Sequence, residues 1–154
     1  YPLPEAQMDR FLVKLGIGYP DEATERRILS ARRSLRPSDA KVPAVLALSD
    51  IVSAQAKVRS MHMDREIEGY VVSLVRATRA HPAVRLGASP RAALALGALS
   101  QAIAWTAGRG HVMPEDVQEA VRPVLSHRIL ARDASAGAAV RILDDVLRTV
   151  AVPV

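Results

Sequence analysis

Apolar and polar positions along this 154-residue chain repeat mainly with the period of an α-helix. The clearest case is 64–79, where Asp64 can cap a helix whose apolar stripe follows the i, i+3, i+4, i+7 spacing through Ile67, Tyr70, Val71 and Leu74. Comparable stripes and start signals predict four further helices. The first covers 49–59, and the second runs from 89 to the glycines at 108 and 110. The third starts at 114, and the last runs from a Ser cap at 135 to about 150.

The N-terminal third has a different pattern. Pro4 to Phe11 predicts a short helix with proline in its first turn. From Phe11 to Tyr19 apolar residues occupy every second position, which predicts a single strand. Asp21 can then cap a helix that ends near residue 35, and a proline-containing connector follows over 37–47. One strand among so many predicted helices favours a mainly α fold, a helical bundle.

The composition is that of one domain with a core of its own. About 150 residues is close to the commonest domain size, and 49% of the residues are apolar. The absence of cysteine excludes disulfides, thiol nucleophiles and thiolate metal sites. No apolar run approaches the roughly 20 residues of a membrane helix, and no secretory signal pattern opens the chain, so we expect a cytoplasmic protein without a membrane partner. Because the first residue is not Met, we also expect a piece of a longer protein.

The charge is basic but mixed along the chain. There are 21 Lys and Arg residues against 16 Asp and Glu residues, a net charge of +5, and Arg supplies most of the positive charge. Acidic residues are interspersed with the arginines and no block of five like charges occurs. This pattern is more typical of solvated helix surfaces than of a nucleic-acid stripe.

Several chemistries are excluded by the motifs that are missing or mismatched. No Gly-Lys-Ser/Thr is present, so the chain lacks the P-loop that wraps phosphates. Asp21-Glu22 follows the apolar run as a magnesium-binding Asp-Glu pair would, but the cap function of Asp21 explains it better. The histidines are too far apart for helical zinc ligands, so we expect no metal site: His62, His81, His111 and His127.

Arg91 occupies an electrostatically unfavourable place. It is the second residue of the helix that opens Gly87-Ala88-Ser89-Pro90, where the helix dipole is already positive. An anion bound there would remove the conflict, because free backbone amides and a guanidinium together make a phosphate site. The alternative is that the Arg91 side chain bends into solvent and the small cost is tolerated.

Arg10 ends the short N-terminal helix. A cation is favourable at the carbonyl end of a helix, so local electrostatics require no function here. Arg10 nevertheless lies between a helix end and a predicted strand, where the backbone is held rigidly. From there its guanidinium could reach a neighbouring molecule.

Four segments, in this order, resemble the C-terminal part of MoxR-type AAA+ ATPases. They are YPLPEAQMDRF, the predicted strand ending in GYPDE, YVVSLVRATRAHPAVRLGASPRAALAL and GRGHVMPEDV. The resemblance runs from Tyr1 to about Leu130. It implies that residues 1–20 are the last helix and strand of an α/β ATPase core and that 21–154 form the helical lid. The P-loop, the Asp-Glu strand and the sensor 1 residue of such ATPases are absent from this sequence.

The resemblance also implies roles for individual residues. Arg10, in the DRF segment, corresponds to the arginine finger, which would be catalytic. Arg91 corresponds to the sensor 2 arginine, and Ser89 and Pro90 belong to the same nucleotide-binding segment. Arg91 would reach the nucleotide of its own subunit and Arg10 the γ-phosphate in the next one. We therefore expect ATP and Mg²⁺ in the full-length protein, and neither turnover nor tight nucleotide binding by this chain alone.

The expected partners follow from the same resemblance. They are neighbouring subunits of a homo-oligomeric ring, a hexamer, with client proteins and a protein carrying a von Willebrand A domain. The implied activity is chaperone-like remodelling or metal-cofactor insertion.

The residues by themselves leave a second function open, a stand-alone basic helical domain that binds nucleic acid or serves as an adaptor. DNA affinity that falls steeply with salt would identify it. Only 3% of residues are aromatic, which argues against stacking on single strands.

Overall fold

The computed structural model describes residues 3–34, 43–133 and 135–153. The chain divides into two compact units. The main unit consists of residues 1–14 and 54–154, and the smaller unit of residues 15–53.

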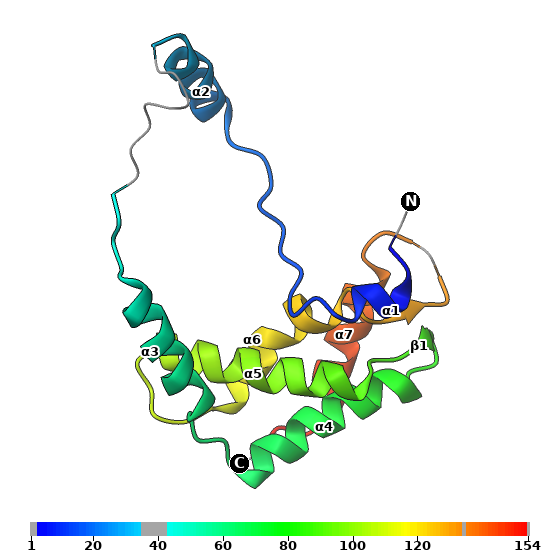
Figure 1. Ribbon diagram of the computed structural model, residues 1–154. Coiled ribbons are helices and arrows are strands. Elements are labelled where there is room, and N and C mark those ends of the chain that lie inside the picture. The colour runs from blue at the N-terminus through cyan, green and yellow to red at the C-terminus, as the bar shows by residue number, and fades with distance from the viewer. Residues whose placement is uncertain (1–2, 35–42, 134, 154) are drawn as a thin grey trace. The chain divides into compact units, whose positions relative to one another are not determined.

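The main unit is built from helices (Figure 1). They are α1 (Glu5–Met8), α4 (Arg65–Ala80), α5 (Pro90–Thr106), α6 (Pro114–Leu125) and α7 (Ala138–Thr149). Strands β1 (Val84–Leu86) and β2 (Leu130–Ala131) pair antiparallel beside them. The smaller unit holds α2 (Glu22–Ser34), and α3 (Leu48–Arg59) runs from the smaller unit into the main one. This confirms the predicted mainly α fold.

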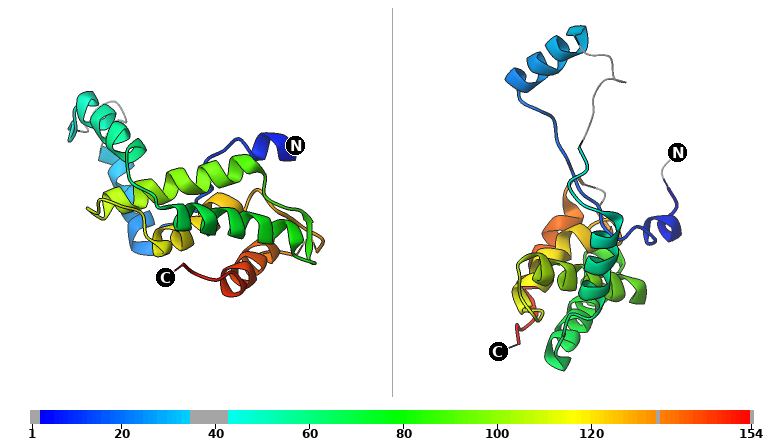
Figure 2. Two further views of the ribbon diagram at one scale, coloured as in Figure 1. Left: turned by 90° about the horizontal axis from the view of Figure 1, so that it is seen from below. Right: turned by 60° about the vertical axis from the view of Figure 1, so that its left-hand side comes forward.

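The core lies between α4, α5, α6 and α7, where α4 and α5 run side by side (Figure 2). Each of these helices turns its apolar stripe inward, and Leu74, Leu96, Leu125 and Leu143 are completely buried. Burial of a leucine side chain contributes about 2 kcal/mol of transfer free energy. Among the described helices, none has both the length and the hydropathy required to cross a bilayer.

The strand predicted from Phe11 to Tyr19 is wrong. Residues 11–20 belong to no strand, with a bend at Leu12 and a left-handed Gly18 (φ 71°), and Ile17 and Tyr19 are almost fully exposed. An isolated period-two segment has no ladder partner to satisfy its backbone. One anchor is the Lys14 N–H, which donates to the carbonyl of Pro123 at 2.8 Å.

Most predicted helices are confirmed within a few residues, with corrections at their ends. The predicted helix Pro4 to Phe11 is only Glu5–Met8, and Pro4 is its N-cap. Asp21 caps α2, accepting from the N–H of Thr24 at 2.7 Å. The last helix is capped by Gly137 instead of Ser135, whose hydroxyl donates to Asp133. Residue 35, the predicted end of α2, and residues 37–42 of the predicted connector lie outside the described residues.

Candidate functional site

Arg10 lies in the turn that follows α1. Its backbone N–H donates to the carbonyl of Gln7 at 3.1 Å, and the next carbonyl, of Phe11, is held by two side chains of the 127–128 segment. The Arg10 side chain is exposed, and no hydrogen bond or ion pair engages it within the described part of the chain. The backbone is therefore fixed while the guanidinium remains available.

Arg91 projects from the first turn of α5. The Ser89 hydroxyl oxygen caps this helix by accepting from the N–H of Ala92 at 3.3 Å, and Pro90 occupies the first helical position. Arg91 is exposed, and it too makes no hydrogen bond or ion pair with any described residue. The predicted position of Arg91 as the second residue of a helix is confirmed, and no carboxylate among the described residues pairs with it; an exposed side chain is also what the alternative of solvation predicts.

Arg10 and Arg91 line the same hollow. Its volume is about 240 Å³, and it is lined by Arg10, Leu12, Arg91, Leu94, Ala95, Ala98 and Arg128. The lining thus contains three arginines and no acidic side chain. Such a hollow can bind an anion, but its lining offers no general base and no nucleophile for chemistry of its own.

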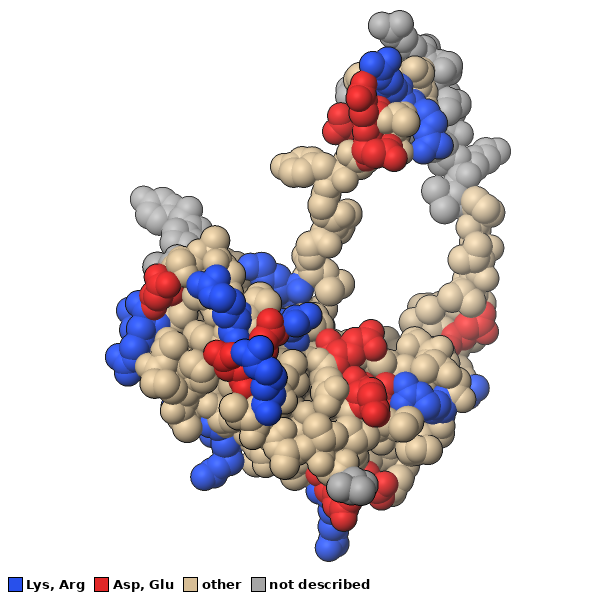
Figure 3. Space-filling model, turned by 180° about the vertical axis from the view of Figure 1, so that it is seen from behind, with Lys and Arg blue, Asp and Glu red and all other residues tan. Residues whose placement is uncertain are grey.

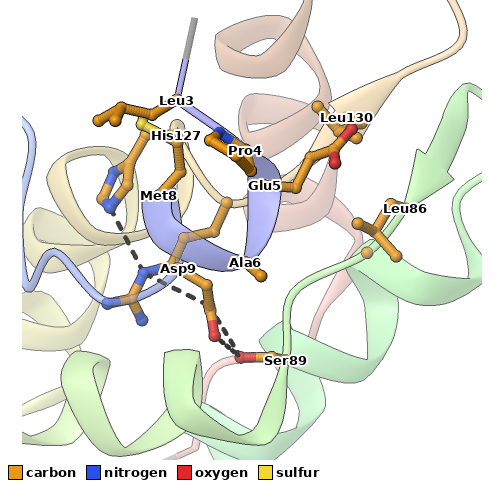
Figure 4. A pocket seen from close by; sticks show the side chains of 12 residues that line it. Leu3, Pro4, Glu5, Ala6, Met8, Asp9, Leu86, Ser89, His127 and Leu130 are labelled. Atoms are coloured by element: carbon orange, nitrogen blue, oxygen red, sulfur yellow. Dashed lines mark hydrogen bonds and ion pairs between the residues drawn. The ribbon is translucent and has the colours of Figure 1, made fainter.

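Pro90 and Ser89 are placed differently from the two arginines. Pro90 lines a separate depression with residues of α4, among them Val75 and Arg79. The Ser89 hydroxyl is turned to the α1 turn, where it lies 2.9 Å from both carboxylate oxygens of Asp9 and donates to that carboxylate (Figure 4). The structure therefore gives Ser89 a structural contact between α5 and the turn that carries Arg10.

Arg128 was missed by the sequence analysis. Its side chain is 1% exposed. The guanidinium donates through Nη2 to the Phe11 carbonyl at 2.6 Å, and its Nε lies 3.9 Å from the Asp9 carboxylate. Burial lowers the pKa of Arg128, the Asp9 carboxylate opposes that shift, and the positive charge of Arg91 adds to it.

His127 contacts the same carbonyl. Its Nε2 lies 3.0 Å from the Phe11 oxygen, which requires the tautomer with the proton on Nε2. Burial is the main cause that lowers the pKa of His127; the charges of Arg128 and Lys14 act in the same direction, while the Phe11 carbonyl and Asp9 oppose it. His127 and Asp9 also line a cavity of about 770 Å³ between α1 and the β1–β2 end of the main unit (Figure 4).

The GRGHVMPEDV segment has a structural function in this fold. The Arg109 guanidinium donates to both carboxylate oxygens of Asp116, whose residue is 2% exposed, and the N–H of Met113 donates to the same carboxylate at 2.8 Å. Burial alone would raise the pKa of Asp116, but the hydrogen bonds from Arg109 and Met113 lower it overall.

Comparison with known proteins shows which family this chain resembles. Residues 76–150 match the AAA lid domain. The whole chain aligns with 49% of the uncharacterized protein YeaC of Bacillus subtilis at 38% identity, and 99% of it aligns with 43% of the chaperone MoxR1 of Mycobacterium tuberculosis, also at 38% identity. A crystal structure of a candidate ATPase from Cytophaga hutchinsonii superposes on the whole chain with a TM-score of 0.84, at 28% identity and over 50% of its own length.

The chain carries the AAA lid domain and is homologous to the C-terminal half of MoxR-family proteins. It spans about half the length of the curated relatives it matches. Within this MoxR-family lid, charges of both signs are interspersed over the main unit on the face shown in Figure 3, as the sequence predicted.

Three residues around the turn that carries Arg10 were not found from the sequence: Asp9, His127 and Arg128. Asp9 directly precedes Arg10. Its acidic side chain beside a candidate arginine finger is the one feature of the sequence that could have pointed to it. His127 and Arg128 lie beyond α6 in a short segment without periodicity, so their relation to the α1 turn exists only in the folded chain.

Proposed function

We propose that this chain supplies Arg10 and Arg91 to ATP hydrolysis in a MoxR-family AAA ATPase. The observation that carries the proposal is the common hollow, whose lining includes the exposed side chains of Arg10 and Arg91, neither of which pairs with another described residue. Negative charge spreads over the transferred phosphoryl group in the transition state, and an arginine that meets this charge raises the rate by about 10³- to 10⁵-fold where such fingers have been characterised.

We further propose that both arginines act on one nucleotide, bound by the neighbouring subunit. The family resemblance alone assigned Arg91 to the nucleotide of its own subunit and Arg10 to that of the next. Two side chains that line one hollow of about 240 Å³ are better placed for a single phosphate group. Charge-assisted hydrogen bonds from both would then strengthen together as charge develops.

Under this proposal, the other elements of the ATPase lie elsewhere in the full-length protein or in neighbouring subunits. ATP is the substrate, and Mg²⁺ and the P-loop contacts come from the preceding half of a full-length protein. Residues 1–20 complete the ATPase core, 21–154 form the lid, and a hexameric ring brings subunits together. Client remodelling or metal-cofactor insertion, with a von Willebrand A domain partner, is the proposed output. The name of the chaperone MoxR1 supports the first of these.

Single substitutions in the full-length ATPase test the roles of the arginines. Arg10→Ala and Arg91→Ala are each expected to lower hydrolysis, by about 10³-fold for the finger, while ATP binding is retained. Arg76→Ala is the matched control, because it removes one exposed positive charge from α4. Hydrolysis at the parental rate by the Arg10→Ala protein would refute the finger assignment.

Mixed rings test whether the two arginines share a nucleotide. If Arg91 acted within its own subunit, mixing Arg10→Ala and Arg91→Ala subunits would recreate intact interfaces, about a quarter of the total in a random ring. If both arginines come from the same subunit, every interface remains defective. We expect no recovery of hydrolysis on mixing, and recovery toward a quarter of the parental rate would refute the shared nucleotide.

A further inference from the structure

Arg128 has a donor that the fold leaves unused. The side chain is 1% exposed, and its Nη2 is committed to the Phe11 carbonyl at 2.6 Å. Its Nε lies 3.9 Å from the Asp9 carboxylate and 3.4 Å from His127 Nε2, which cannot accept from it while that nitrogen donates its own proton to Phe11. Nη1 is buried and has no hydrogen-bond partner among the described residues. Buried donors of a charged group are normally satisfied, so this orphan atom needs an explanation.

The position of Arg128 beside the hollow suggests what the unused Nη1 donor binds. Arg128 lines the hollow together with Arg10 and Arg91, so the lining has a third arginine, and Arg128 also lines the larger cavity beside α1. Burial is the main cause that lowers the pKa of Arg128, Asp9 opposes it, and the charge of Arg91 is the smallest of the three and acts with burial. Asp9 is the carboxylate paired with Arg128, and it also accepts the Ser89 hydroxyl. The cluster therefore keeps an excess of positive charge that an anion in the hollow would neutralise.

We propose that Arg128 is a third phosphate-binding side chain of this site, with Nη1 donating to an oxygen of a phosphoryl group that lies between Arg10 and Arg91. This inference rests on the proposed function and adds a phosphate-binding residue that the family resemblance did not supply. The two terminal nitrogens of the guanidinium then bind different groups. Nη2 fixes the Phe11 carbonyl next to Arg10, and Nη1 contacts the anion.

The same chemistry would recognise the phosphates of a nucleotide or free pyrophosphate. The direct test therefore uses this 154-residue chain and sodium pyrophosphate, with calorimetric titration at low salt. Arg128→Lys keeps the charge but removes the forked donors. We expect it to weaken pyrophosphate binding by 10-fold or more, an effect similar to those of Arg10→Ala and Arg91→Ala, whereas Arg76→Ala on α4 changes the affinity by less than twofold.

A measurement on the unsubstituted chain guards against a variant that fails to fold. The Arg128 Nε–H signal, assigned by NMR through its own backbone, is expected to shift on addition of pyrophosphate, in step with the signal of Arg91. The Arg76 signal is expected to stay in place. A merely structural Arg128 would show no such shift, because its contact with Phe11 does not involve the ligand.

Each contrary outcome is decisive. No detectable pyrophosphate binding, or equal weakening by Arg76→Ala, overturns the site. Binding that depends on Arg10 and Arg91 but is unchanged in Arg128→Lys, with an unshifted Arg128 signal, overturns the role of Arg128 and leaves the proposed function standing. The proposed function fails by a different measurement, the hydrolysis of full-length rings that carry Arg10→Ala.

Discussion

The carboxylate of Asp9 accepts a hydrogen bond from the hydroxyl of Ser89, 80 positions later in the chain, with both carboxylate oxygens 2.9 Å away. Asp9 immediately precedes Arg10, and Ser89 lies two residues before Arg91. The contact therefore joins the two backbones that carry the candidate arginines. Asp9 is also the counter-charge of the buried Arg128 guanidinium. One carboxylate thus sets the geometry of the whole cluster.

Asp9→Ala is expected to destabilise the chain by about 1–3 kcal/mol, because it removes the Ser89 contact and leaves the Arg128 charge without a partner. Urea unfolding followed by circular dichroism measures the change. Glu119→Ala, an exposed carboxylate on α6, is the control and is expected to cost no more than about 0.5 kcal/mol. Equal losses in the two variants would show that the Asp9 contacts do not stabilise the fold.

The four core helices could be predicted from the sequence because their signals are local. The apolar stripe defines α4, and a serine cap followed by proline defines the start of α5, without reference to the rest of the chain. The β1–β2 pair could not be found, because three and two residues are too few to show a period. The run Phe11 to Tyr19 shows the converse error, a clear period in a segment that finds no neighbouring strand.

The candidate site was only partly predictable for a similar reason. The position of Arg91 at a helix start is a local property and could be predicted as an anion site. The convergence of Arg10, Arg91 and Arg128 depends on the Phe11 carbonyl meeting a side chain 117 positions away. That contact is a product of tertiary packing and has no sequence signal. The catalytic roles themselves stay predictions.

Asp116→Asn tests the buried pair that orders the loop before α6. It is expected to cost about 3 kcal/mol at neutral pH, because it removes the charge that holds Arg109. The folded-state pKa of Asp116 is lowered, so its contribution to stability is present above the unfolded value near 4 and is lost as the pH falls below it. The stability difference between the parent and the variant should therefore shrink in acid. A difference that stays constant down to pH 2 would contradict this account.

His127 predicts a second pH dependence in a higher range. The pKa of His127 is lowered in the folded state, chiefly by burial and also by the charges of Arg128 and Lys14, whereas the Phe11 carbonyl and Asp9 oppose the shift. The unfolded chain then binds the extra proton more readily, so stability is full above about pH 6.5 and declines as the pH falls through the folded value. Unfolding free energies between pH 7.5 and about 5 measure this slope.

The matched comparison for this slope is His127→Gln against His111→Gln. Both remove one histidine, but His111 is exposed while His127 is packed against the α1 turn. We expect the slope to diminish in His127→Gln and to persist in His111→Gln. If both variants keep the parental slope, another group is responsible for it.

Gly87 and Gly69 provide a pair of glycine substitutions with opposite expected signs. A Cβ on Gly87 would lie 2.6 Å from the Cα of Arg79, so the β1–α5 connection passes against the α4 backbone too closely for any other residue. Gly87→Ala must displace this connection and with it the Ser89 contact to Asp9, at a cost of about 1–3 kcal/mol. Gly69 lies within α4 with nothing within 4 Å of its Cβ position, so Gly69→Ala should stabilise the chain by up to about 1 kcal/mol.

Thermal melts give the sign of both stability changes, and pyrophosphate titration should show weaker binding for Gly87→Ala alone. A Gly87→Ala chain that melts at or above the parental temperature would mean that the close approach to α4 is not maintained in solution.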